Sequence, residues 1–268
     1  MGTPMISEAL PLLLWGTVGA CLLMVVAWVA HLQTRNAGWV DVAWAFGLGG
    51  LAVYFAWAGS GEPSRRLLVG IMGGVWGLRL STHLFLRVLR DPHEDGRYVA
   101  IRQAWGGAIE LKFLGFFLFQ GLLDVFLALP FLLACLDSSP QIHPLAWVGA
   151  GLWALSILGE ATADRQLQRF KQDPLNRGRV CREGLWGVSR HPNYFFEWLI
   201  WVAFALIATA SPWGWTAWSC PLLMLYFLLR VTGIPATEEQ SLRSKGEAYR
   251  RYQLEVSPFV PWFPRGTL

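Results

Sequence analysis

Long apolar segments recur along the whole chain and constrain its fold more than any other feature. About seven stretches qualify, at residues 9–31, 39–59, 67–89, 111–136, 144–161, 194–211 and 213–233. A bilayer core about 30 Å thick needs about 20 apolar residues per helix. Only 15% of the residues are charged, against about 25% in a typical soluble domain. The sequence therefore predicts an all-α polytopic membrane protein, a bundle of seven transmembrane helices forming one integral membrane domain over residues 1–268.

The distribution of basic residues predicts the orientation of this bundle. Lysine and arginine are concentrated in three polar segments, 90–110, 162–193 and 234–268, whereas Arg65 and Arg66 stand alone between the second and third spans. Loops rich in these residues stay in the cytoplasm. We therefore expect the N-terminus outside, the C-terminus in the cytoplasm and any water-soluble cofactor on the cytoplasmic face. The net charge of +4 comes from these loops, so a nucleic-acid partner is not expected.

Several familiar site patterns are missing from the sequence. The four cysteines, Cys21, Cys135, Cys181 and Cys220, show no metal-like spacing, so neither a metal site nor a disulfide framework is expected. The glycine-rich string "FGLGG" at 46–50 lies inside an apolar span and follows no strand. A Rossmann dinucleotide site is therefore not supported, and a bound nucleotide would need a pocket within the helices. No feature of the sequence indicates an obligate protein partner. Membrane lipids are the expected surroundings of the protein.

Polar side chains inside or at the ends of the apolar spans are candidates for function, because they are costly in a membrane. Several come in pairs four residues apart, which places both on one helical face. The set comprises Asp41, Arg79 with His83, Gln120 with Asp124, Glu160 with Asp164, Asn193 with Glu197, and Arg230. Each pair taken alone can equally be structural. Their gathering toward one end of the bundle favours a shared site there over a transport path across the midplane.

The string "GLWGVSRHPNYFFEW" at 184–198 is the most polar stretch at the mouth of an apolar span. Pro192 suits the first turn of a helix, where its missing N–H costs nothing. We expect Asn193 and Glu197 to face the bundle, and Arg190 and His191 to stay at the water side. This cytoplasmic loop carries basic residues that can bind phosphates, namely Arg169, Lys171, Arg177, Arg179 and Arg190. The alternative is a loop whose charges only set the topology.

This string resembles a superfamily of membrane enzymes that includes steroid 5α-reductases, sterol reductases and isoprenylcysteine carboxyl methyltransferases. The resemblance is good from about Glu160 to the tail "EAYRRYQLEVSPFVPWFP". The strings "VDVAW" and "EDGRY" in the N-terminal half look like the bacterial steroid 5α-reductase-like branch. The resemblance implies seven transmembrane helices, a bacterial cytoplasmic (inner) membrane, substrate binding mainly in 1–136 and cofactor binding mainly in 144–268.

The reductase resemblance also implies the cofactor, NADPH, and the residues that hold it. It assigns NADPH contacts to Arg79, Asp164, Lys171, Arg179, His191, Asn193, Tyr194, Glu197 and Arg230. Two positions depart from the animal steroid enzymes, because Lys171 stands in place of an arginine and Glu160 in place of an asparagine. Lysine keeps the charge of arginine but lacks its planar fork of donors.

The catalytic residues of that family are matched less directly. The animal enzymes polarise the steroid ketone with a glutamate in the second helix and a tyrosine in the third, where this chain has Trp76. Asp41, His83 and Tyr98 are the substitutes of suitable chemistry. The implied reaction is hydride transfer to an enone in a steroid or similar lipid from the bilayer. The alternative is an S-adenosylmethionine-dependent methyltransferase of the isoprenylcysteine carboxyl methyltransferase type.

Overall fold

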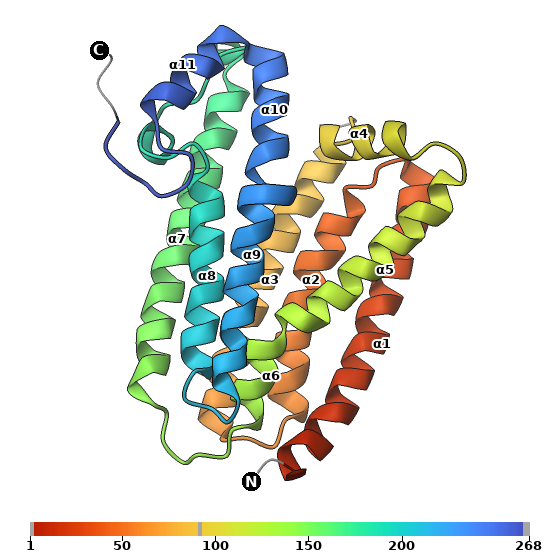
Figure 1. The fold of residues 1–268 in the computed structure, drawn as a ribbon, viewed down its shortest axis with the longest axis vertical. Helices are drawn as coiled ribbons and strands as arrows, with labels where there is room; N and C mark the ends of the chain where they lie inside the picture. The colour runs from red at the N-terminus through yellow and green to blue at the C-terminus, as the bar shows by residue number, and fades with distance from the viewer. Residues whose placement is uncertain (1–2, 91–92, 265–268) are drawn as a thin grey trace. The chain divides into compact units, whose positions relative to one another are not determined.

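The computed structural model describes residues 3–90 and 93–264, and every regular element in these ranges is a helix. The α-helices are α1 (Thr3–Thr34), α2 (Trp39–Ala58), α3 (Pro63–Arg90), α4 (Gly96–Trp105), α5 (Ile109–Leu127), α6 (Leu129–Leu136), α7 (Pro144–Gln172), α8 (Pro192–Ala208), α9 (Ser219–Tyr226), α10 (Ile234–Lys245) and α11 (Glu247–Glu255). Short helical turns lie at Pro174–Asn176, Gly184–Gly187 and Gly214–Trp218, and a π-helical turn at Phe227–Val231. Figure 1 shows their course.

The predicted all-helical membrane class is confirmed in its main features. Within the described ranges, six helical stretches are long and apolar enough to cross a membrane. They are Ile6–Thr34, Trp39–Ala58, Pro63–Arg90, Ile109–Leu136, Pro144–Gln172 and Gly214–Lys245. The stretch predicted as the sixth span is the shorter apolar helix α8, of 17 residues. The chain is therefore a multi-pass membrane protein.

The chain folds into two compact units. Unit 1 comprises residues 1–147 and 207–217, and unit 2 comprises residues 148–206 and 218–268. Unit 1 thus contains α1 to α6. Unit 2 contains most of α7 and α8, together with α9 to α11.

Small residues bring α2 and α3 of unit 1 unusually close together. A Cβ atom added to Gly77 would lie 2.6 Å from the Cα atom of Gly49, and one added to Gly73 would lie 2.2 Å from the Cβ atom of Ala52. Stripes of glycine and alanine allow membrane helices to pack backbone against backbone, where dispersion contacts replace the missing hydrophobic effect. Gly49 of "FGLGG" therefore serves helix packing.

A buried ion pair fixes the turn between α2 and α3 against the segment after α6. Arg65 is 3% exposed and lies 3.0 Å from the carboxylate of Asp137. Its guanidinium also donates to the carbonyl oxygens of Asp137, Ser139 and Gln141. Since a buried charge is tolerated only with partners, Arg65 has a structural role.

Helix α4 lies across the end of unit 1 at which α3 ends and α5 begins (Figure 1). Asp95 caps its first turn by accepting the backbone N–H of Arg97, the usual role of aspartate at a helix start. Tyr98 is buried in an apolar cluster with Met24, Val40 and Phe113, which come from α1, α2 and α5. One side chain therefore anchors α4 to three long helices.

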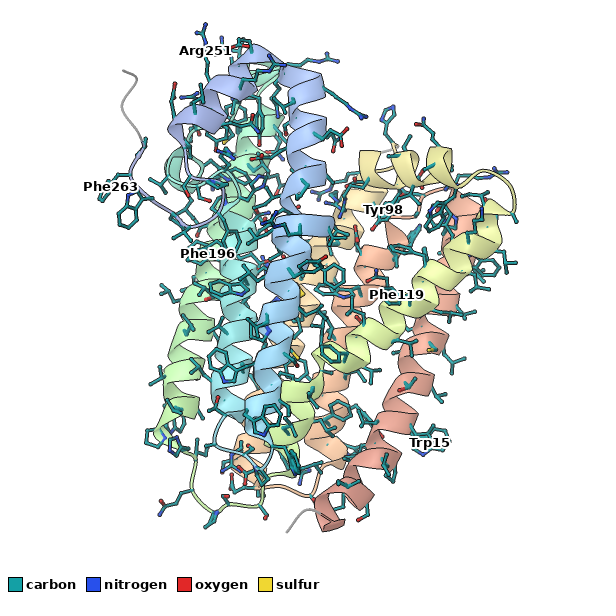
Figure 2. The ribbon with its side chains drawn as sticks, in the orientation of Figure 1. Trp15, Tyr98, Phe119, Phe196, Arg251 and Phe263 are labelled. Atoms are coloured by element: carbon teal, nitrogen blue, oxygen red, sulfur yellow. The ribbon has the colours of Figure 1, made fainter. Side chains whose placement is uncertain are left out.

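Unit 2 combines long helices with a loop that the C-terminal segment covers. Helix α7 continues to Gln172, so Asp164, Gln168 and Lys171 share a helix as predicted. A Cβ atom on Gly159 of α7 would lie 2.5 Å from the ring of Phe196 on α8 (Figure 2). Tyr252 of α11 donates to the carbonyl oxygen of Trp186 in the loop, so α11 holds the loop in place.

Candidate functional site

A carboxylate and a phenol form the centre of the polar site in unit 1. The Tyr98 hydroxyl on α4 donates a 2.6 Å hydrogen bond to Oδ1 of Asp41, in the first turn of α2. The two residues are 57 positions apart in the sequence. Figure 2 labels Tyr98 in this part of the protein. The structure therefore joins two of the three catalytic residues that the sequence predicts.

Two arginines complete the surroundings of Asp41. Nη2 of Arg97 lies 3.0 Å and Nη2 of Arg87 3.2 Å from Oδ2 of the same carboxylate. Arg97 also pairs with Asp95 through its Nε atom, at 3.1 Å. Each oxygen of Asp41 thus accepts from a defined donor.

Burial changes the acidity of the groups on α4. Burial raises the pKa of Tyr98 well above its ordinary value, and the negative charge of Asp41 raises it further. Burial alone would lower the pKa of Arg97, but the negative charges of Asp41 and Asp95 raise it overall. Tyr98 is therefore a neutral donor near pH 7, and Arg97 is a permanent cation.

A second polar chain runs beside this centre and fastens α4 to its neighbours. Glu94 accepts from the backbone N–H of Ala37 and binds the guanidinium of Arg102, at 2.8 and 3.0 Å. Arg102 reaches Glu110 of α5 at 3.4 Å, and Glu110 in turn lies 2.9 Å from Nε2 of His31 on α1. The residues link α1, α4 and α5.

The other two predicted residues of unit 1 lie on α3. Arg79 and His83 are both half-buried and occur two turns and one turn before Arg87. Their spacing places them on one face of the helix, as the sequence predicts.

In unit 2, Asp164 of α7 and Asn193 of α8 are brought together. Nδ2 of Asn193 lies 3.3 Å from Oδ1 of Asp164, and both side chains are half-buried. Glu197, one turn further along α8, is half-buried as well. A carboxylate beside a carboxamide offers both acceptors and donors to a sugar hydroxyl or an amide.

The expectation that Arg190 and His191 stay at the water side is wrong. Arg190 is 8% and His191 2% exposed. Arg190 donates to Glu238 at 2.6 Å and to the carbonyl oxygens of Gln253 and Val256. The folded C-terminal segment covers both residues, because it supplies the acceptors that a buried guanidinium needs.

His191 and Tyr194 form a stacked pair at the start of α8. Their ring centroids are 5.5 Å apart and the planes are within 5° of parallel. Nε2 of His191 lies 3.3 Å from Glu238, and the Tyr194 hydroxyl lies 3.2 Å from that of Thr237 on α10. Burial lowers the pKa of His191, although Glu238 partly opposes this shift. The pair therefore presents a neutral imidazole.

Four of the five basic residues predicted to bind phosphates are exposed, namely Arg169, Lys171, Arg177 and Arg179, whereas Arg190 is buried. Arg230, predicted to lie near the cofactor, is exposed as well. Burial raises the pKa of Cys181, while the charges of Lys245 and Lys171 partly oppose this shift. Both lysines therefore act electrostatically on the same part of the loop, and Lys245 is a cation that sequence reasoning did not select.

The site contains charged residues that were not among the predicted site residues. Glu94, Asp95, Arg97 and Arg102 all come from the segment that begins with "EDGRY", and Glu110 follows at the start of α5. The sequence does contain a signal for these site residues, because four of the five lie within nine residues and carry both signs of charge. Outside the spans such charges are usually read as solvated.

Comparison with known proteins shows the family of the chain. Residues 27–256 match the family described as "Protein of unknown function (DUF1295)". A protein of the fission yeast Schizosaccharomyces pombe, described as uncharacterized, is 29% identical over 264 residues, which cover 88% of this chain and 76% of the yeast protein. No solved structure matches the chain. Since the family match spans most of its length, the chain belongs to the DUF1295 family, which is associated with steroid 5α-reductase-like membrane proteins.

Proposed function

We propose that this protein is an NADPH-dependent membrane reductase that reduces the carbon–carbon double bond of an enone in a steroid-like lipid. The hydrogen bond between Tyr98 and Asp41 is the observation that carries the proposal. Reduction of an enone places negative charge on the ketone oxygen, and a preorganised donor aimed at that oxygen stabilises the charge. A neutral, buried phenol is suited to this role.

The surroundings of Asp41 explain how the phenol can serve a substrate. A hydroxyl has one proton, and that of Tyr98 is directed at Asp41. When this proton turns toward a ketone oxygen, Asp41 still accepts from Arg87 and Arg97. The carboxylate is therefore not left without donors, and the exchange costs less than it would at an isolated acid.

The residues of unit 2 fit the chemistry of NADPH. The exposed cations Lys171 and Arg179 suit phosphate groups. The half-buried Asp164 and Asn193 suit ribose hydroxyls or a carboxamide. When bound, the cofactor supplies a hydride to the β-carbon, and uptake of a proton at the α-carbon completes the reduction. In this proposal His191, stacked on Tyr194, fixes the start of α8 and thereby the direction of Asn193.

Purified protein in detergent provides the test. With a 3-oxo-4-ene steroid we expect oxidation of NADPH, followed by the loss of its near-ultraviolet absorbance, and a product that gains two hydrogen atoms by mass spectrometry. Tyr98→Phe should lower kcat about 100- to 1,000-fold, as expected for loss of one oxyanion donor. The exposed Tyr226 on α9 provides the matched control, Tyr226→Phe.

Binding measurements distinguish NADPH from S-adenosylmethionine as the cofactor. Glu197→Gln and Asn193→Ala should weaken NADPH binding, whereas Glu239→Gln, at an exposed position on α10, should not. Binding of S-adenosylmethionine without NADPH oxidation would replace the reductase with a methyltransferase. Mass spectrometry of any small molecule that co-purifies with the protein gives an independent answer.

We also propose that α8 crosses the membrane as a seventh span. The N-terminus then lies outside, and the segment from α10 to the C-terminus lies in the cytoplasm. The membrane in this proposal is the inner membrane of a bacterium. The apolar composition of α8 and the excess of lysine and arginine around α4, the end of α7 and α11 support this arrangement.

A further inference from the structure

A groove on the surface of unit 1 lies between the end of α2 and the start of α3. It encloses about 600 Å³ and is lined by Val53, Ala56, Trp57, Pro63, Arg66, Leu67, Gly70 and Ile71. All but Arg66 are apolar or glycine. Gly70 allows α2 and α3 to approach closely beside the groove, because a Cβ atom there would lie 2.8 Å from the Cβ atom of Ala56.

Arg66 supplies the charge at the groove. Its Nε and Nη2 atoms donate to the carbonyl oxygens of Ala56 and Trp57, each at 2.8 Å. These carbonyls belong to the last turn of α2, whose backbone acceptors lack partners within the helix. The guanidinium is thus held in one orientation. Within residues 3–90 and 93–264, no carboxylate forms an ion pair with Arg66, in contrast to Arg65 with Asp137.

The position of the groove relative to the bilayer indicates its occupant. Helices α2 and α3 both have the length and composition of membrane spans, and the groove follows their ends. Trp57 and Leu67 are 78% and 63% exposed, and tryptophan is enriched where the lipid headgroups begin. In a bilayer that α2 and α3 cross, the apolar walls would face acyl chains and Arg66 would lie near the phosphates.

We propose that this groove binds one anionic phospholipid, with an acyl chain along Val53, Gly70 and Ile71 and the phosphate group against Arg66. The phosphate group and the acyl chain are bound by different parts of the groove. A positive charge without a carboxylate partner attracts an anionic headgroup, and the apolar walls of the groove accommodate an acyl chain. The proposal does not depend on the reductase activity.

Native mass spectrometry of the delipidated protein with added phosphatidylglycerol or phosphatidylcholine tests the proposal. We expect one phosphatidylglycerol molecule to bind more tightly than any further lipid molecule, and to raise the melting temperature of the protein. Arg66→Gln should weaken this binding about fivefold, the value of one basic residue near an anionic surface. Arg90→Gln is the matched control, because Arg90 is an exposed arginine at the other end of α3.

A second variant tests the acyl chain separately. Ile71→Trp adds a bulky ring at an exposed position of the groove wall and should reduce binding of both phospholipids while the helical circular dichroism stays unchanged. Equal effects of Arg66→Gln and Arg90→Gln would overturn the headgroup contact. Unchanged phosphatidylglycerol binding by Ile71→Trp, or equal stabilisation by inorganic phosphate, would overturn the groove as the binding site.

Discussion

At the scale of single residues, the carboxyl group of Asp124 on α5 has the most unusual environment. Asp124 is fully buried, and in the described part of the chain neither of its oxygens has a hydrogen-bond partner. It fits only because Gly47 of α2 lacks a side chain: a Cβ atom there would lie 2.8 Å from Oδ2. Acidic residues within spans normally face partners or water, so this group costs stability.

Replacement of Asp124 by leucine should therefore stabilise the protein. The buried unsatisfied group costs about 1–3 kcal/mol, and an apolar side chain removes this cost. Asp124→Asn is the matched control: its amide is of similar size but is equally unsatisfied, so the melting temperature should change little. Thermal unfolding in detergent measures both. A lower melting temperature for Asp124→Leu would show that the carboxyl group stabilises the fold through a bound proton or ligand.

His191 makes the stability of the protein depend on pH. Because burial lowers its pKa below the ordinary value of 6.5, unfolded His191 takes up a proton at a higher pH than folded His191 does. The unfolded state then binds more protons, and stability falls as pH drops through about 6.5. Its charged neighbours are Glu238 and Arg190.

His191→Gln should therefore flatten the decline in melting temperature between about pH 7.5 and pH 5.5, the window around the ordinary histidine pKa. His93→Gln, at an exposed position before α4, is the control. An equal decline in wild type and His191→Gln would mean that another group controls this pH range.

At the scale of elements, α4 is a short helix that depends on side-chain contacts for its position. Its 10 residues are too few for a stable isolated helix. Tyr98 packs its ring among α1, α2 and α5, while Arg102 binds Glu94 and Glu110. Since Arg97 and Tyr98 belong to α4, any loosening of this helix displaces the donors of Asp41.

Arg102→Gln should loosen α4 selectively. Charged hydrogen bonds contribute more than neutral ones, but partial exposure reduces the value of the Arg102 pairs. We expect amide hydrogen exchange in residues 96–105 to rise about tenfold while exchange in α3 is unchanged. Gln103→Ala, at an exposed position of the same helix, should have little effect. Equal exchange in wild type and Arg102→Gln would show that Tyr98 alone fixes α4.

At the scale of the whole molecule, the number of spans determines on which sides of the membrane the chain begins and ends. Seven spans place the termini on opposite sides, whereas the six long helices alone would place them on the same side. The apolar helix α8 therefore decides the topology.

Reporter fusions at the two ends test the topology. We expect a C-terminal fluorescent protein to fold in the cytoplasm and an N-terminal alkaline phosphatase to be active outside. A fusion between α8 and α9, near Trp213, should report the outer side. Activity of both terminal reporters on one side would leave six spans and exclude α8.

Local patterns in the sequence were sufficient for the membrane class and for most helices, because apolar periodicity and length are properties of contiguous residues. They also placed Asp164, Asn193 and Glu197 on helices near polar segments. The continuation of α7 to Gln172 follows from the same pattern, since polar residues at four-residue spacing keep the helical period.

Only the tertiary structure decided which polar groups meet. The contact between Asp41 and Tyr98 joins residues 57 positions apart, and the burial of Arg190 depends on the carbonyl groups of Gln253 and Val256, far along the chain. The stripe of glycines on α2 acquires its meaning only from its counterpart on α3. A sequence determines which side chains are costly to bury, but the packing of distant elements determines which partners offset that cost.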